Sequence, residues 1–304
     1  MNNLGLHVRL WLVAGFWGVA WTAGRVVATE MDDWPVFGAW LRYIIAVPAF
    51  LLWLRWSEGW FVPSIAQWKR LFWIGACSTF LYQVLFMHGM GLTAAGDASL
   101  MITLNPLFTS VLAVIVLGHP MTKELGGGLF LGLLGITVLF LASPNVDLPA
   151  NERWLGNGFI ATSALAWAAA TLLIRRAMDV EESERDGPMS PLQITVWSSA
   201  VGLVFLTPWS GYEVGANGLP VVDVASLASI VFLAMMSTVL AYVWFAEGVK
   251  RIGPSRTSTY VYFVPVFGIL SGYVLLDEQL GWSLALALVL ILSGVSLAQR
   301  STKA

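Results

Sequence analysis

The segment "SLMITLNPLFTSVLAVIVLG" (Ser99–Gly118) contains no charged residue, yet Pro106 lies in its middle. The segment "SRTSTYVYFVPVFGILSGYVLL" (Ser255–Leu276) has a similar form, with Pro265 at the corresponding place. A proline inside a helix removes a backbone donor and clashes with the carbonyl four residues earlier, which costs about 3 kcal/mol. Because two similar apolar segments both contain a proline despite this cost, we expect a repeated element in which the proline has a structural or functional role.

The composition indicates that these segments lie in a membrane. The chain has 304 residues, of which 58% are hydrophobic and only 11% are charged. An ordinary soluble domain carries about 25% charge, so there are too few charges here to cover a globule in water. The 16 tryptophans agree with this reading, because Trp collects at membrane interfaces.

Hydropathy predicts an all-α integral membrane protein with ten transmembrane helices. About 20 apolar residues cross a bilayer as a helix, and runs this long exclude the alternating strands of a membrane barrel. The predicted spans are residues 6–28, 35–56, 69–90, 95–117, 124–143, 155–177, 190–209, 224–248, 254–275 and 280–299.

The distribution of basic residues predicts that both termini are cytoplasmic. Lys and Arg prefer the cytoplasmic side of a membrane. If the N-terminus lies inside, most of the 16 basic residues fall on the inner side, among them Lys69, Arg70, Lys250 and Arg251. Arg25, near the far end of the first span, is then expected to be an interfacial anchor. The outer loops carry mainly acids, among them Glu213 and Glu278.

The chain also matches itself when it is shifted by 159 residues, which pairs Ser99 with Ser258 and Pro106 with Pro265. Each half holds five spans, residues 1–147 and 148–304. Because five is odd, the second half is expected to be inverted relative to the first. Inverted repeats are typical of secondary transporters, in which the two halves exchange shapes and expose a central site to each side in turn.

The two prolines are therefore predicted to act as hinges or gates. In the first half, hydroxyl side chains share a helical face with the proline, namely Ser99, Thr103 and Ser110. In the second half, the matching face carries Ser258 and Tyr262. The hydroxyls indicate either a wet, deformable pathway or a packed kink in which they bond their own backbone.

Several motifs resemble those of a known family. These are "WGVAWTAGR" (17–25), "LRYIIA" (41–46), "NPLFTSVLAVIVLGHPMT" (105–122) and "VPVFGILSGYVLLDEQLG" (264–281). Together they resemble the drug/metabolite transporter superfamily, specifically its EamA-type members, and most closely the aromatic amino-acid exporters of the YddG type. His119 departs from the pattern, because the family often has Glu there. The resemblance implies a bacterial inner membrane protein in which spans one to four and six to nine surround a central cavity. Spans five and ten would then lie at the periphery.

Polar and aromatic side chains that would be unfavourable in contact with lipid are candidates for a substrate site. Trp17 and Trp21 lie one turn apart in the first span, and Trp167 takes the matching place in the sixth, within "AWAAAT". The remaining candidates are polar or aromatic residues within spans, namely Tyr82, Gln83, Ser99, Thr103, Asn105, Tyr242, Ser258 and Tyr262. Buried polar groups are costly unless they are paired or wet, so these residues predict a pocket with aromatic walls and neutral hydrogen-bonding groups. For each aromatic side chain, ordinary helix packing is the alternative.

Three charged or titratable residues are candidates for a charge role. Arg42 lies about 10 Å along the second span at 1.5 Å per residue. It is expected to hold a substrate carboxylate, to extend outward to the membrane surface, or to pair with Asp32 or Asp33. His88 and Glu247 are repeat partners, for which proton coupling and a role at the mouth of the pathway both remain open.

The sequence thus predicts a secondary exporter of small amphipathic metabolites, chiefly amino acids including aromatic ones. No acid lies in the middle of a span, so we expect facilitative or weakly proton-coupled transport. An exporter of drugs or cationic compounds is the alternative. A membrane enzyme is not expected, because the chain has neither H-E-x-x-H nor G-x-S-x-G. No cofactor, metal or nucleic-acid partner is expected, and the protein is expected to be a monomer or a weak homodimer. Gly128, Gly132 and Gly135 would pack within the monomer or at a dimer contact.

Overall fold

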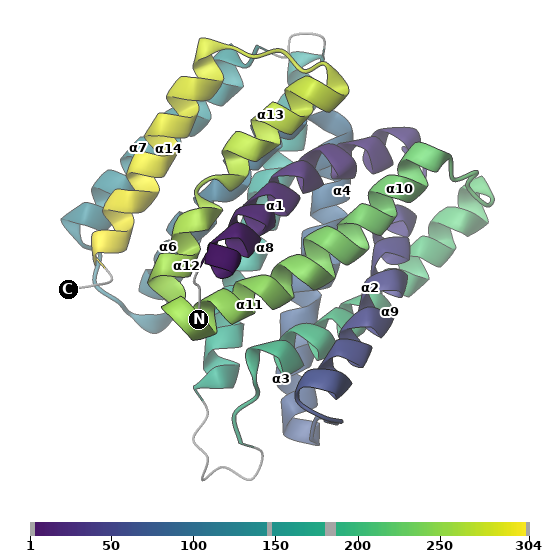
Figure 1. The fold of residues 1–304 in the computed structure, drawn as a ribbon. Helices are drawn as coiled ribbons and strands as arrows, with labels where there is room; N and C mark the ends of the chain where they lie inside the picture. The colour runs from purple at the N-terminus through teal and green to yellow at the C-terminus, as the bar shows by residue number, and fades with distance from the viewer. Residues whose placement is uncertain (1–3, 145–147, 180–186, 302–304) are drawn as a thin grey trace.

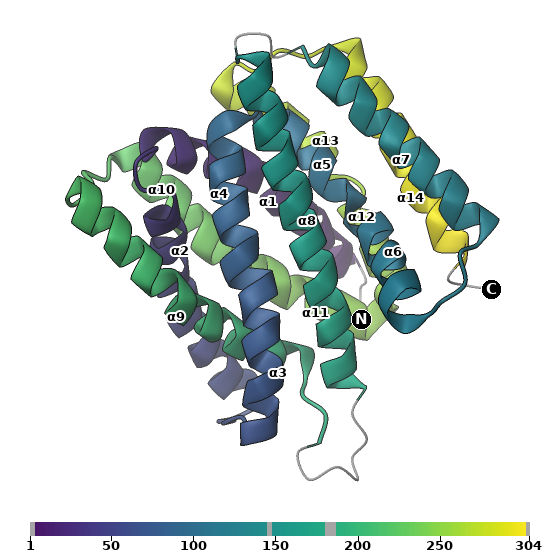
Figure 2. The same cartoon turned by 180° about the vertical axis from the view of Figure 1, so that it is seen from behind.

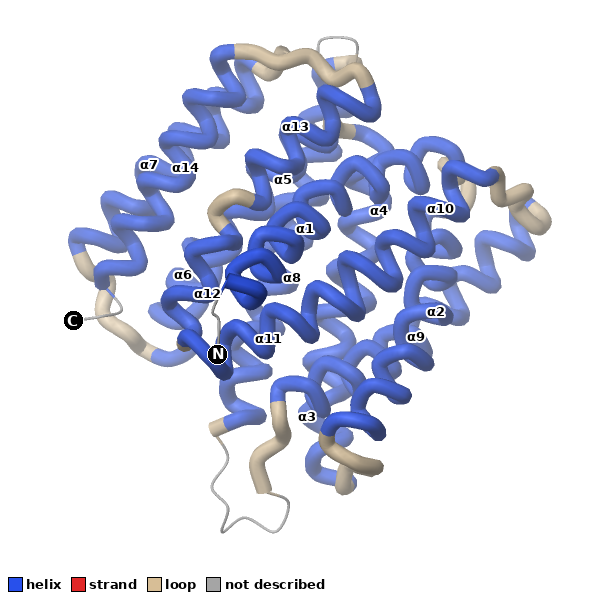
Figure 3. Tube along the Cα trace, in the orientation of Figure 1, coloured by secondary structure: helices blue, strands red, loops and turns tan. Residues whose placement is uncertain are grey.

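The computed structural model describes residues 4–144, 148–179 and 187–301, and within them it confirms ten apolar helical spans. Its elements are α1 (Leu4–Glu30), α2 (Pro35–Ser57), α3 (Ile65–Gly75), η1 (Ala76–Leu81), α4 (Tyr82–Leu92), α5 (Ala95–Met101), η2 (Ile102–Leu104), α6 (Asn105–Leu117), α7 (Lys123–Ala142), α8 (Ala150–Met178), α9 (Pro191–Asn217), α10 (Val224–Phe232), η3 (Leu233–Leu240), α11 (Ala241–Ile252), α12 (Pro254–Val261), α13 (Val264–Leu276) and α14 (Trp282–Ser301). No strand occurs in the described ranges (Figure 3).

The seventh span differs most from its predicted end. It continues to Asn217 through Pro208, whereas hydropathy ended it at residue 209. The extra turns bury Glu213, which the charge pattern had placed in an outer loop. Its carboxylate accepts hydrogen bonds from the backbone N–H groups of Val36 and Phe37, at 3.1 and 2.8 Å. Glu213 therefore caps the first turn of α2, where carboxylates are favoured.

The helices form one main bundle with a separate pair at its side (Figures 1 and 2). The side pair is α7 and α14, as the family resemblance implied. Gly128 of α7 faces the Gly294 carbonyl and Ala298, and Gly135 faces Ile291. These small residues let the two backbones approach within the chain, which is how helices commonly pack in lipid. The first and last described residues lie at the same end of the bundle (Figure 1).

Both prolines mark the start of a new helix. The fourth span divides into α5 and α6 around the 3₁₀ turn Ile102–Leu104, and the ninth divides into α12 and α13 around Tyr262–Phe263. Pro106 and Pro265 lie in the first turn of α6 and α13. A first-turn N–H has no partner within its own helix, so a proline there loses little. The free-energy cost of a proline in a helix interior, which the sequence had suggested for both spans, is therefore largely avoided.

The same irregularities recur at the 159-residue shift. The ranges of α6 and α13, Asn105–Leu117 and Val264–Leu276, correspond residue for residue, and each ends at a left-handed residue, Gly118 or Asp277. The third and eighth spans both contain a π-helical segment, and these end at the equivalent residues Leu81 and Leu240. The helix breaks of the two halves thus recur at the same 159-residue spacing as the sequence match.

Pro106→Ala is expected to change stability little, by about 1 kcal/mol or less, because the first turn of α6 does not need the missing donor. Thr109→Pro, one turn further into the same helix, should cost about 3 kcal/mol, because it removes an internal hydrogen bond. Thermal unfolding of the two purified variants in one detergent measures the contrast. A loss for Pro106→Ala as large as that for Thr109→Pro would contradict this account of the break.

Candidate substrate site

Four of the predicted aromatic side chains meet between α1, α4, α8 and α11. The Trp17 and Tyr242 ring centroids lie 5.7 Å apart, those of Tyr242 and Trp167 6.4 Å, and those of Trp167 and Tyr82 5.4 Å. We call these four residues the aromatic cluster. It continues through Phe86, whose ring lies 5.9 Å from that of Tyr82 and 5.3 Å from that of Trp21. All four residues of the cluster are partly buried.

The π-helical segments place the two tyrosines. η1 ends immediately before Tyr82, and η3 ends two residues before Tyr242. A π-helical turn adds a residue to the helix and re-aims the side chains that follow, and such turns are frequent at functional sites. Trp17 is fixed by the same region, because its indole N–H donates to the Ser237 carbonyl of η3 at 3.0 Å. A π-helical segment thus precedes each of the two tyrosines.

Arg42 of α2 lies beside this cluster. Its Nε and Nη2 donate to the Thr238 hydroxyl at 3.0 and 2.7 Å, and its guanidinium lies 5.6 Å from the Tyr43 ring. It is within electrostatic reach of both Tyr82 and Tyr242. One expected alternative, a pair with Asp32 or Asp33, does not occur among the ion pairs of the described residues. Among the described residues no carboxylate forms an ion pair with Arg42, which leaves a positive charge next to the aromatic cluster.

Sequence reasoning missed two neighbours of Arg42. Tyr43 is buried, and its hydroxyl accepts a hydrogen bond from Gln83 Nε2 at 3.3 Å, which ties α2 to α4. Thr238 is also buried and donates its own proton to the Leu233 carbonyl at 2.8 Å. Tyr43 could have been found from its place next to Arg42 in "LRYIIA". Thr238 is 196 residues from Arg42, so nothing local in the sequence links the two.

The other predicted site residues take different positions. Ser99 is buried against Gly268, as is Trp21, and its hydroxyl donates to the Gly96 carbonyl at 2.8 Å. Thr103 donates to the Ser99 carbonyl at 2.9 Å, and Asn105 accepts from Thr109 at 3.2 Å within its own helix. These hydrogen bonds within the same span agree with the alternative in which the hydroxyls near Pro106 bond their own backbone at a packed kink.

In the second repeat, the Tyr262 hydroxyl donates to Gln299 of α14 at 2.5 Å, which directs it toward the side pair. Ser258 is half-buried on α12. No ring contact or hydrogen bond among the described residues joins Thr103, Asn105, Ser258 or Tyr262 to the aromatic cluster.

His88 and Glu247 lie away from the aromatic cluster. The His88 Nδ1 contacts the Val84 carbonyl of its own helix at 2.7 Å, and its ring lies 6.2 Å from that of Phe159. Glu247 forms ion pairs with Arg9 at 2.7 Å and with Arg251 at 2.6 Å. These partners show how each residue is held and leave any part in proton coupling a prediction.

Ten helices that are long and apolar enough to cross a bilayer define a multi-pass membrane protein. Two segments, residues 8–141 and 154–299, match the EamA-like transporter family, and the chain belongs to that family.

Relatives and a solved structure agree with this assignment. The chain is 26% identical to "Uncharacterized transporter YyaM" of Bacillus subtilis, over 97% of this chain and 95% of that protein. It is 28% identical to "Probable amino-acid metabolite efflux pump" of Salmonella typhimurium, over 93% of this chain and 91% of that protein. A solved structure titled "Crystal structure of protein" has the same fold, with a TM-score of 0.60 and 18% identity over 98% of both chains. The family and these names point to a transporter rather than an enzyme.

Proposed function

We propose that this transporter exports amino acids, including aromatic ones, and binds them at the aromatic cluster. An aromatic amino acid would place its side chain against Trp17, Tyr82, Trp167 and Tyr242 and its carboxylate at Arg42. Two supports are independent of each other: the geometry of these residues, and the similarity to a protein named as an amino-acid metabolite efflux pump. A resemblance to YddG-type exporters is the narrower form of the same proposal.

The observation that carries the proposal is the charge of Arg42. A guanidinium binds a carboxylate with two parallel hydrogen bonds, and such bonds are among the strongest in proteins. Because Arg42 has only a neutral hydroxyl as hydrogen-bond partner among the described residues, it can exchange or share that bond with an incoming carboxylate. The same positive charge disfavours cationic drugs, which makes them the weaker candidates.

We further propose that transport proceeds by alternating access between two inverted repeats. The recurrence of helix breaks at one shift supports a common architecture for the halves, and an odd number of spans in each would invert the second. With both termini cytoplasmic, the site would open to either side of the inner membrane in turn. Among the described residues, the acids within spans lie near span ends, as Asp97, Glu213 and Glu247 do. Facilitative or weakly proton-coupled transport fits that distribution.

Trp167→Ala should lower the initial rate of tryptophan transport in liposomes about tenfold, because a well-packed Trp at a binding site contributes at least 1–2 kcal/mol. The ring joins Tyr82 to Tyr242, so its loss opens the middle of the cluster. Trp56→Ala is the matched control, since the Trp56 side chain is 76% exposed at the end of α2. Equal rates for both variants at equal amounts of folded protein would place the site elsewhere.

A further inference from the structure

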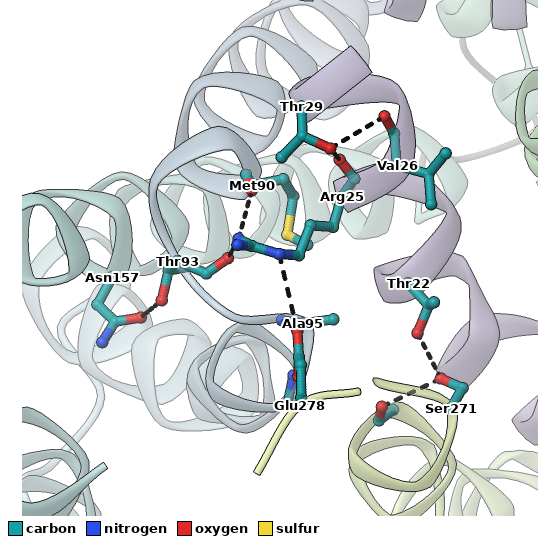
Figure 4. A network of polar contacts seen from close by, with 12 residues as sticks. Thr22, Arg25, Val26, Thr29, Met90, Thr93, Ala95, Asn157, Ser271 and Glu278 are labelled. Carbon is teal, nitrogen blue, oxygen red and sulfur yellow. Dashed lines mark hydrogen bonds and ion pairs between the residues drawn. The ribbon is translucent and has the colours of Figure 1, made fainter. Parts of the chain in front are cut away.

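Arg25 and Glu278, which the substrate site does not use, form an ion pair (Figure 4). Glu278 lies in the connection that follows α13, at the end of the bundle opposite the termini (Figure 1). Glu278 follows α13, and its Oε1 and Oε2 accept hydrogen bonds from the backbone N–H groups of Ala95 and Gly96, at 2.6 and 2.9 Å. Its Oε1 also lies 3.8 Å from Arg25 Nε. One carboxylate from the second repeat thus holds both the start of the fourth span and an arginine of the first.

The local backbone is built to admit this carboxylate. Asp277 adopts a left-handed conformation, with φ of 53°, and turns the chain so that Glu278 points back toward α5. Glycines stand on both sides of the carboxylate. A Cβ at Gly272 would lie 2.4 Å from Glu278 Oε2, and one at Gly96 would lie 3.4 Å from it. A larger residue at position 272 would therefore displace the carboxylate.

Arg25 extends the connection to two further helices. Its Nη1 donates to the Met90 carbonyl at 3.2 Å and to the Thr93 carbonyl, at the junction of α4 and α5. The Thr93 hydroxyl donates to Asn157 of α8 at 2.7 Å, and the buried Asp97 adds a second negative charge near the guanidinium. Only 15% of the Arg25 side chain is exposed, and its described partners lie on other elements of the bundle. Its network links α1, α4, α5, α8 and the α13–α14 connection.

The second repeat has no equivalent network at the other end among the described residues. At the 159-residue shift, Glu278 corresponds to His119, which is exposed. At the 150-residue offset that pairs Trp17 with Trp167, the counterpart of Arg25 is Arg175, which is 70% exposed and pairs with Asp179 of its own helix at 3.5 Å. At this end the second repeat supplies a carboxylate and the first a mostly buried arginine, whereas at the other end the first supplies an exposed histidine and the second an exposed arginine.

Helix packing shows the same asymmetry. α13 packs closely on α5, because Gly268 faces Ser99, and the Thr22 and Ser271 hydroxyls meet at 2.6 Å beside them. The described residues of α6 and α12, the equivalent pair at the other end, show no comparable packing. The end that holds Arg25 and Glu278 is therefore the more tightly closed one in this structure.

We propose that Arg25 and Glu278 are the gate at this end, and that their separation opens the site to that side. The inference rests on alternating access, and it assigns a gating role to two residues outside the aromatic cluster. A closed gate must be stable enough to hold and weak enough to open, so a change of a few kcal/mol in its strength shifts the populations of the two states.

The test uses a cysteine under the gate. Ser99 is fully buried and lies one turn below Ala95, and Cys77 is the only native cysteine. In a Cys77→Ser, Ser99→Cys background, labelling by a membrane-impermeant maleimide should be slow from either face of the membrane. Glu278→Gln should raise the labelling rate from the face nearer Ala95 about tenfold or more, because it removes the charge that holds Arg25 and α5 together. Glu152→Gln, an exposed carboxylate at the same end, should leave the rate unchanged.

Gly272→Ala provides a second route to the same state, because it keeps Glu278 and displaces its carboxylate. Both variants should elute as folded monodisperse protein and both should label faster. If folded Glu278→Gln and Gly272→Ala label at the rate of the background protein, the gate assignment is wrong. Because labelling needs no substrate, this failure is distinct from a failure of the amino-acid proposal, which only flux measures.

Discussion

Arg42→Gln is expected to reduce tryptophan transport by roughly 10- to 100-fold, since a hydrogen bond to a charged group contributes about 1.5–3 kcal/mol. Glutamine keeps a donor for Thr238 and removes the positive charge, so the substrate carboxylate loses its partner. The loss should be larger for tryptophan than for tryptamine, which has the same ring and no carboxylate. Initial rates of uptake into liposomes with equal amounts of folded protein measure both effects.

The matched control for Arg42 is Arg175→Gln. Arg175 is exposed near the end of α8 and pairs only with Asp179 among the described residues, so its loss should leave the rate within about twofold, as expected for an exposed pair. Arg42→Lys keeps the charge and loses the fork geometry, so it should transport at an intermediate rate. If Arg42→Gln lowers tryptophan and tryptamine transport equally, Arg42 has a structural role and the carboxylate is bound elsewhere.

Gly128→Leu is expected to have the largest effect on the fold. A Cβ at position 128 would lie 2.5 Å from the Gly294 carbonyl oxygen and 2.8 Å from the Ala298 Cβ, so α7 and α14 must move apart. Overpacking of this kind costs about 1–3 kcal/mol or more, and a close glycine contact is a main attraction between helices in lipid. The thermal midpoint in detergent should fall by several degrees.

Gly126→Leu is the control for this substitution, because a Cβ at Gly126 meets nothing within 4 Å on the same helix. It has the same change in size and helix propensity, without the contact with α14. Equal midpoints for the two variants would show that the α7–α14 contact does not stabilise the protein.

The sequence predicted the parts of the structure that depend on local patterns. Apolar length found all ten spans, and the shared proline spacing identified the equivalent breaks at Pro106 and Pro265. Aromatic residues in spans of otherwise small side chains, such as Trp167 within "AWAAAT", correctly indicated residues that meet. These features can be predicted because each depends on a pattern within a short stretch of the chain.

Features that need distant residues could not be predicted. The Arg25–Glu278 pair joins positions 253 residues apart, and charge patterning alone placed these residues at a membrane surface. Thr238 was not predicted as a site residue, because a threonine in an apolar span most often forms a hydrogen bond with the backbone of its own helix. It does so here, and it also accepts from Arg42. The π-helical segments likewise have no signature in composition, although they place Tyr82 and Tyr242.

The most direct test of the central claim is flux through the purified protein in liposomes, with labelled tryptophan and tryptamine measured in parallel, with and without an imposed pH gradient. The account predicts saturable transport of tryptophan that exceeds that of tryptamine and changes little when the gradient is removed. Transport of tryptamine without tryptophan would contradict a site in which Arg42 receives a carboxylate, and it would favour an exporter of cationic compounds.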